Sequence, residues 1–74
     1  MINLYSTKGC HYCNLAIDYF ISNNIKYNKL DASLPSVREK LQKLTGQIRV
    51  PVIEIKNKFI IGWDEQKFKE LWKK

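Results

Sequence analysis

The chain has 74 residues, 45% of them hydrophobic, which is enough for one small core and too little for two domains. Its 13 Lys and Arg residues against 7 Asp and Glu residues give a formal net charge of +6, but this charge is scattered and typical of a solvated lysine-rich surface. There is no run of 18 apolar residues, and we identify no secretory signal, RNA-recognition signature or zinc finger. We therefore expect a cytoplasmic protein that binds neither a membrane nor nucleic acid.

The first half of the chain predicts a strand, a helix and a second strand. Residues 1–6 and 25–31 alternate apolar and polar side chains, as strands do, and residues 11–23 repeat apolar side chains at helical spacings. The expected apolar face of that helix contains Tyr12, Leu15, Ala16, Tyr19 and Phe20. Because Ile17 and Ile21 lie off this face, we expect the helix to be buried on more than one side. The strand–helix–strand unit should be parallel, with a right-handed crossover.

A second helix is predicted over residues 33–46. Ser33 or Ser36 is the expected N-cap, and Pro35 suits the first turn. Ser36 followed by Glu39 matches a capping box, and the glycine that closes the segment is a typical C-terminal stop.

The last third of the chain predicts a hairpin and a final helix. Residues 50–55 and 59–61 are expected to form two antiparallel strands joined by residues 56–58. Asp64 can cap a last helix, whose buried stripe is expected to be Phe68, Leu71 and Trp72. The order β-α-β-α-β-β-α gives an α/β fold, a four-stranded mixed sheet flanked by three helices, in one domain over residues 1–74.

Two cysteines, Cys10 and Cys13, stand where the first strand passes into the first helix. A structural zinc site needs four ligands, and one histidine with two cysteines does not complete it within one chain. A structural bridge over so short a loop would stabilise the fold by only about 2 kcal/mol. A redox pair fits better, because the helix N-terminus, Lys8 and a protonated His11 would lower the pKa of the first thiol from about 8.5. A metal or iron–sulfur carrier remains the competing class.

Three stretches of the chain, "LYSTKGCHYCNLAIDYF", "LQKLTGQIRVPVIEI" and "FIIGWDEQKFKEL", resemble the signature regions of glutaredoxins and the related NrdH-type redoxins. The resemblance implies a thioredoxin fold and a thiol–disulfide oxidoreductase that carries electrons, with Cys10 as the nucleophile and Cys13 as the resolving thiol. "RVP" corresponds to a family "TVP" whose proline is cis and faces the cysteines. It therefore implies a cis Val50–Pro51 bond, with the Val50 backbone free to pair with an extended substrate.

The resemblance also implies glutathione as a co-substrate, with no permanently bound cofactor and no metal, in a monomer. The residues expected to bind glutathione or another substrate are Lys8, Tyr12, Arg38, Val50, Pro51, Gly62, Trp63 and Asp64. Simpler roles are open for some of them, since Asp64 can cap a helix, Trp63 can pack, and Lys8 and Arg38 can be solvated.

The chain departs from the glutaredoxin pattern at three places. The motif reads "CHYC" where the family has "CPYC", Arg49 replaces a threonine, and "IGWD" has one glycine where the family has two. These departures bear on glutathione affinity more than on fold or redox chemistry. The alternative function is therefore that of an NrdH-type redoxin, reduced by a thioredoxin-reductase-type flavoenzyme and serving ribonucleotide reductase. Disulfide-containing proteins are the expected partners in either case.

Overall fold

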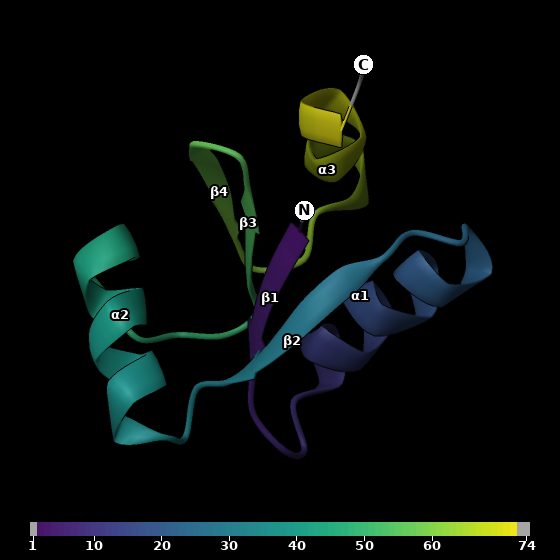
Figure 1. Cartoon of the computed structure of the whole chain (residues 1–74). Coiled ribbons are helices and arrows are strands. Elements are labelled where there is room, and N and C mark those ends of the chain that lie inside the picture. The colour runs from purple at the N-terminus through teal and green to yellow at the C-terminus, as the bar shows by residue number, and fades with distance from the viewer. Residues whose placement is uncertain (1, 73–74) are drawn as a thin grey trace.

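The computed structural model describes residues 2–72, and its element order is the one that the sequence predicts. Figure 1 shows the seven elements, which are β1 (Ile2–Ser6), α1 (His11–Ser22), β2 (Tyr27–Asp31), α2 (Pro35–Thr45), β3 (Val52–Ile55), β4 (Lys58–Ile61) and α3 (Glu65–Trp72). The expected α/β fold class is therefore confirmed. None of the helices within residues 2–72 is long and apolar enough to cross a lipid bilayer.

The sheet has the strand order β2-β1-β3-β4. β1 pairs in parallel with β2, in a register that sets Ile2 beside Tyr27, whereas the β1–β3 and β3–β4 pairs are antiparallel. The predicted mixed sheet is thus confirmed, with the hairpin turning at Lys56 and Asn57 rather than over residues 56–58, because Lys58 already pairs with Ile55. Because β1 and β2 are parallel, their C-terminal ends lie at the same end of the sheet. The chain continues from β1 to the two cysteines and from β2 to α2.

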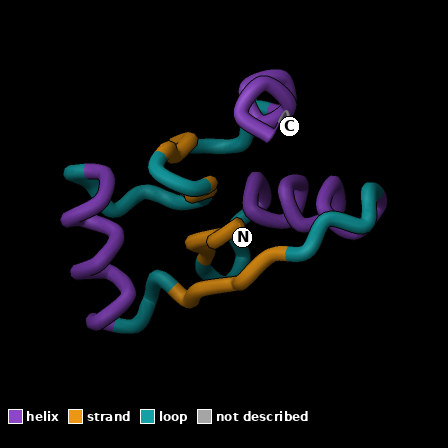
Figure 2. The backbone as a smooth tube through the Cα atoms, turned by 45° about the horizontal axis from the view of Figure 1, so that its top comes forward, coloured by secondary structure: helices purple, strands orange, loops and turns teal. Residues whose placement is uncertain are grey.

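One face of the sheet is covered by α1 and α3, and the other by α2, as the two views of the backbone show (Figures 1 and 2). The core under α1 and α3 is made by alternate residues of the strands with three helical side chains, namely Ile2, Leu4, Ile53, Ile55, Ile60, Ala16, Phe20 and Phe68. A smaller cluster lies under α2 and consists of Tyr5, Ala32, Leu41 and Val52. Alternation along β1 explains the division, since Ile2 and Leu4 point to one face and Tyr5 to the other.

The buried face of α1 differs from the expected one. Cys13, Ala16 and Phe20 are buried, which is the continuous stripe that a period of 3.6 residues gives. Tyr12 and Leu15 are exposed instead of buried, and Ile21 is 63% exposed. Ile17 is partly buried against the core, but the prediction of burial on more than one side was wrong, because the sheet and α3 cover α1 from one side and leave Ile21 open to solvent. On α3, Phe68 is buried as expected, whereas Trp72 is exposed.

The start of α2 also differs from the prediction. Its N-cap is Leu34, which has no side-chain capping bond, so neither Ser33 nor Ser36 caps the helix and the capping box is not formed. The physical reason is Pro35, which restricts the residue before it to extended backbone and so begins the helix itself. At the other end, Gly46 adopts the left-handed conformation, which confirms the predicted stop.

Candidate active site

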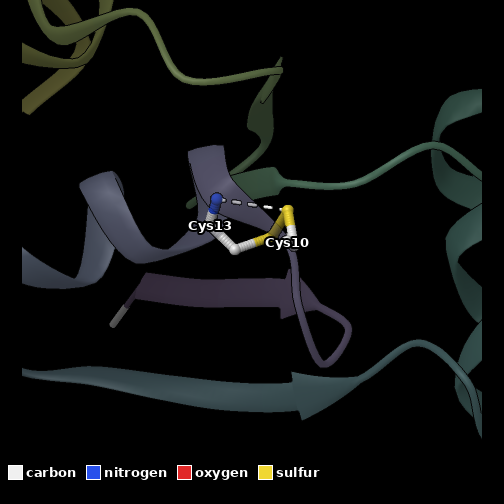
Figure 3. Close-up of a disulfide and its surroundings, with 2 residues drawn as sticks. All are labelled: Cys10 and Cys13. Atoms are coloured by element: carbon white, nitrogen blue, oxygen red, sulfur yellow. Dashed lines mark hydrogen bonds between the residues drawn. A yellow bond between two sulfur atoms is a disulfide. The ribbon is translucent and has the colours of Figure 1, made fainter.

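The cysteine pair lies at the first turn of α1 and is closed as a disulfide (Figure 3). Cys10 is the N-cap residue, in extended backbone, and its Sγ accepts a hydrogen bond of 3.2 Å from the Cys13 backbone N–H. The two Cα atoms are 5.2 Å apart, within the usual range for disulfide-bonded cysteines. The sequence interpretation of a pair that spans the strand–helix junction is confirmed.

The two sulfur-bearing residues differ in exposure. Cys10 is partly exposed, whereas Cys13 is 1% exposed and belongs to the buried face of α1. A reagent or substrate from solvent therefore meets Cys10 first. The backbone N–H groups of the first turn also point toward Cys10, and the first turn of α1 contains no acidic residue to oppose their partial positive charge.

The chain reaches Cys10 through a tight loop after β1. Gly9 has a φ of 74°, a left-handed conformation that side-chain-bearing residues rarely adopt. Lys8, just before it in the chain, is exposed, and so are Tyr12 on α1 and Arg38 on α2. Within residues 2–72, neither Lys8 nor Arg38 takes part in an ion pair. Both cations are thus accessible to an anion from solvent.

Two further segments predicted for the site are joined to each other by hydrogen bonding. The Val50–Pro51 bond is cis, as the resemblance implied, and Pro51 is buried just before β3. Its carbonyl oxygen accepts the Gly62 N–H at 2.7 Å, which fixes the turn after β4 against the residue before β3. Gly62 has a φ of 85°, so glycine is needed there for backbone reasons alone.

Trp63 and Asp64 both have structural contacts. The Trp63 ring packs against Tyr19, Phe20 and Phe68, with ring centroids 5.3, 5.9 and 5.8 Å away. Asp64 caps α3, since its Oδ1 accepts the Lys67 N–H at 3.1 Å and its carbonyl accepts the Phe68 N–H at 2.9 Å. The predicted capping role of Asp64 is confirmed.

A small polar pocket, which the sequence did not reveal, opens beside the loop that leads to Cys10. It has a volume of about 180 Å³ and is lined by Ser6, Thr7, Lys8, Lys29 and Asp31. Asp31 Oδ1 accepts two hydrogen bonds from Ser33, from the backbone N–H at 2.9 Å and from the hydroxyl at 2.6 Å. These bonds, and then the charges of Lys8 and Lys29, hold the pKa of Asp31 below its usual range. The sequence signal for this turn is Asp31 followed two residues later by Ser33, because an Asp side chain often accepts hydrogen bonds from the residue two positions on.

Within residues 2–72 no three or more His, Cys, Asp or Glu side chains come together in a way that could hold a metal ion.

Comparison with known proteins gives consistent results. Residues 2–60 match the family model described as Glutaredoxin. A protein of Clostridium pasteurianum, described as an uncharacterized glutaredoxin-like 8.6 kDa protein in rubredoxin operon, is 33% identical over 75 residues, which span the whole of both chains.

Two solved structures are similar in fold. The NrdH-redoxin of Escherichia coli, described as a glutaredoxin-like protein with a thioredoxin-like activity profile, superimposes with a TM-score of 0.85 at 16% identity. That match covers 99% of this chain and 96% of the other. A buckwheat glutaredoxin in complex with glutathione gives a TM-score of 0.68 at 26% identity, over 82% of this chain and 59% of the other.

Proposed function

Because this chain belongs to the glutaredoxin family and has the thioredoxin fold, it is a glutaredoxin-like thiol–disulfide oxidoreductase, and we propose that Cys10 is its nucleophile and Cys13 its resolving thiol. The observation that carries this assignment is the unequal surroundings of the two sulfurs. Cys10 is partly exposed and accepts a backbone N–H at the helix start, whereas Cys13 is buried. A donor N–H and the helix N-terminus both favour the thiolate, which is the reactive form.

The proposed reaction proceeds in two exchanges. The Cys10 thiolate attacks one sulfur of a substrate disulfide, forms a mixed disulfide and expels the other sulfur as a thiolate that takes up a proton. Cys13 then loses its proton and attacks the Cys10 sulfur, which releases the second substrate thiol and closes the Cys10–Cys13 disulfide. Two electrons pass to the substrate, and the enzyme pair is oxidised. The backbone places the two cysteines one helical turn apart, so the second attack needs no unwinding of α1.

Glutaredoxins use glutathione as a substrate, and we propose that this chain binds it across the surface around Cys10. Lys8 and Arg38, exposed and without ion pairs in the described chain, would meet one glutathione carboxylate. The Val50 backbone would pair with the cysteinyl part, beside the exposed Tyr12.

The remaining interactions come from the turn after β4. The amides after Gly62 would receive the other carboxylate, because the Gly62 N–H itself is donated to Pro51. Asp64 would hold the ammonium group with the carboxylate oxygen that the helix cap leaves open. The bulk of Ile61 and Trp63 on either side of the single glycine limits how closely the tripeptide approaches. Because each such interaction at an exposed surface is weak, we expect the absence of one of them to weaken glutathione binding several-fold without abolishing it.

The electron donor that restores the thiols is the point on which a second function rests. The single glycine, together with the match of nearly the whole length of the Escherichia coli NrdH-redoxin, favours an alternative in which a thioredoxin-reductase-type flavoenzyme is the donor. In the glutaredoxin alternative, two glutathione molecules reduce the disulfide and become oxidised glutathione.

Two experiments test these proposals. Cys13→Ser should trap a stable mixed disulfide between Cys10 and glutathione, visible by mass spectrometry, whereas Cys10→Ser should trap none. The assignment would be reversed if Cys10→Ser trapped glutathione on Cys13 and Cys13→Ser trapped none on Cys10. A coupled assay that compares glutathione plus its reductase with a thioredoxin reductase alone identifies the donor. Turnover with the flavoenzyme only would favour the NrdH-type function.

A further inference from the structure

The polar pocket beside the active-site loop brings together charged groups from two neighbouring strands. Ser6 and Asp31 end β1 and β2 and face each other in the parallel register, so the pocket lies at the edge of the sheet from which the loop to Cys10 departs. Lys29, two residues before Asp31, lies on the same face of the sheet. Lys8 enters the pocket from the loop. The cation expected to serve glutathione thus shares a small space with a carboxylate.

The carboxylate in this pocket is held in place rather than free to turn away. Both Ser33 hydrogen bonds end on the same oxygen, Asp31 Oδ1. The backbone of this turn is also closed, because the Leu34 N–H is donated to the Asp31 carbonyl. A side chain fixed from one oxygen presents its negative charge in one direction. The charged groups that face it are Lys8 from the loop and Lys29 from β2. Lys8 is also the cation that adjoins Cys10 along the chain, and His11 is the titratable residue that follows Cys10.

We propose that Asp31 is a positioning residue that limits the reactivity of Cys10 and the recognition of glutathione by opposing the positive charge of Lys8. The inference deepens the proposed function, on which it rests, because it takes Cys10 as the nucleophile and Lys8 as a contact of the glutathione carboxylate. The Lys8 ammonium favours both the Cys10 thiolate and an incoming carboxylate. A fixed negative charge in the same pocket as that ammonium reduces the positive potential that either of them meets.

The expected size of the effect is modest, because the pocket is open to solvent. Exposed charges interact weakly and are screened over about 8 Å at physiological ionic strength. Removal of the Asp31 charge should therefore raise the Cys10 alkylation rate below neutral pH, and the affinity for a glutathione mixed-disulfide substrate, by about two- to fivefold each. Both gains should shrink as salt is added.

The informative substitution is Asp31→Asn, because its amide oxygen still accepts both hydrogen bonds from Ser33 and so keeps the turn. Alkylation rate against pH is measured in the Cys13→Ser background, and substrate KM in the dithiol protein. Asp18→Asn is the matched control, since it removes the same charge from an exposed position on α1, outside the pocket. We expect a faster rate below neutral pH and a lower KM for Asp31→Asn, and values close to the parent protein for Asp18→Asn.

A double-mutant cycle with Lys8→Ala decides whether the effect passes through Lys8. If it does, Asp31→Asn changes little in the Lys8→Ala background. Equal changes in Asp31→Asn and Asp18→Asn would overturn the proposal, as would an Asp31→Asn effect that persists in full without Lys8. Glutathione trapping on Cys10 is measured in the same proteins. Loss of that adduct from the parent Cys13→Ser protein would mean that the proposed function itself is wrong.

Discussion

The two faces of the sheet are built differently. The face under α1 and α3 has the larger apolar core, and Phe20 lies at its centre, with the rings of Tyr27 and Phe68 at 5.1 and 5.2 Å. At one end of this face polar side chains follow, those of Ser6, Lys29 and Asp31. The face under α2 has a small apolar cluster around Leu41 and, next to it, a polar row across the strands. In that row Asn28 donates to Asn3, while Asn3 and the Tyr5 hydroxyl both donate to Glu54.

This difference separates the origin of stability from the origin of chemistry. Cys13 and Trp63 both belong to the α1 and α3 side, as part of the buried face of α1 and as a partner of its aromatic rings. The more exposed Cys10, Lys8 and Arg38 lie outside either core. The proposed resolving thiol is thus buried on the face of α1 that packs on the larger core, whereas the proposed nucleophile and its cations can be altered with little effect on packing.

The largest expected effect is on the α1 and α3 face. Phe20→Ala should lower the free energy of unfolding by about 3–5 kcal/mol, because it removes a fully buried ring at the centre of the aromatic cluster. Urea unfolding followed by circular dichroism measures it. Since so small a domain has little stability to lose, Phe20→Leu is the second variant, with a smaller loss expected. A decrease of less than about 1 kcal/mol in Phe20→Ala would mean that this face does not dominate stability.

On the opposite face, Leu41→Ala should lower the free energy of unfolding by a smaller amount, about 2–3 kcal/mol. Leu41 is fully buried, but its neighbours Val37 and Leu44 are only partly buried, so the site can close over the missing atoms. The same unfolding measurement gives the comparison. A decrease as large as that of Phe20→Ala would show that the two faces contribute equally to stability, despite their different packing.

The fold was predictable because each element has a plain local signal. Period-two alternation located the first two strands, and Gly46 located the end of α2. The errors came from signals that compete within a few residues. At α2, serine capping patterns competed with Pro35, and the fixed backbone of proline won. On α1, Tyr12 and Leu15 fit a helical spacing equally well, and only the position of the sheet decides which stripe is buried.

The candidate site was predictable in part. The cysteine pair and the cis Val50–Pro51 bond follow from motifs that the resemblance carried. The polar pocket could not be predicted from a motif, because it forms from residues on two strands and a loop, and no single segment contains it. The pairing of Ser6 with Asp31 depends on the parallel register, which the sequence alone does not give.

A smaller effect is expected in the polar row of the α2 face. Burial, with the neighbouring Glu54 charge and hydrogen bond, raises the pKa of Tyr5 above its ordinary value of 10.0. Because the folded state keeps the Tyr5 proton at a pH where the unfolded chain loses it, Tyr5 contributes stability that is fully present below about pH 10 and is lost as the pH rises through the folded-state pKa. Tyr5→Phe should lower the free energy of unfolding by about 1 kcal/mol at neutral pH. At alkaline pH the free energy of unfolding should fall less in Tyr5→Phe than in the parent protein, because Phe does not ionise.

Urea unfolding between neutral and strongly alkaline pH tests this, with Tyr12→Phe as the control because Tyr12 is 59% exposed. The difference between parent and Tyr5→Phe should narrow at alkaline pH, and the difference between parent and Tyr12→Phe should not change. A gap that stays constant for Tyr5→Phe would mean that its ionisation is not coupled to folding.

The smallest expected effect on stability is at Asp64, where a structural and a proposed binding role meet. Asp64→Ser keeps an oxygen that can accept the Lys67 N–H, so the free energy of unfolding should change by only a few tenths of a kcal/mol, whereas Asp64→Ala should cost about 1 kcal/mol. Both remove the negative charge that would hold the glutathione ammonium group. If Asp64 binds glutathione, both variants should raise the KM for a glutathione mixed disulfide by a similar factor, about two- to fivefold, despite their different stabilities. An unchanged KM in Asp64→Ser would leave Asp64 as a helix cap alone, on the side of the molecule that stabilises the fold.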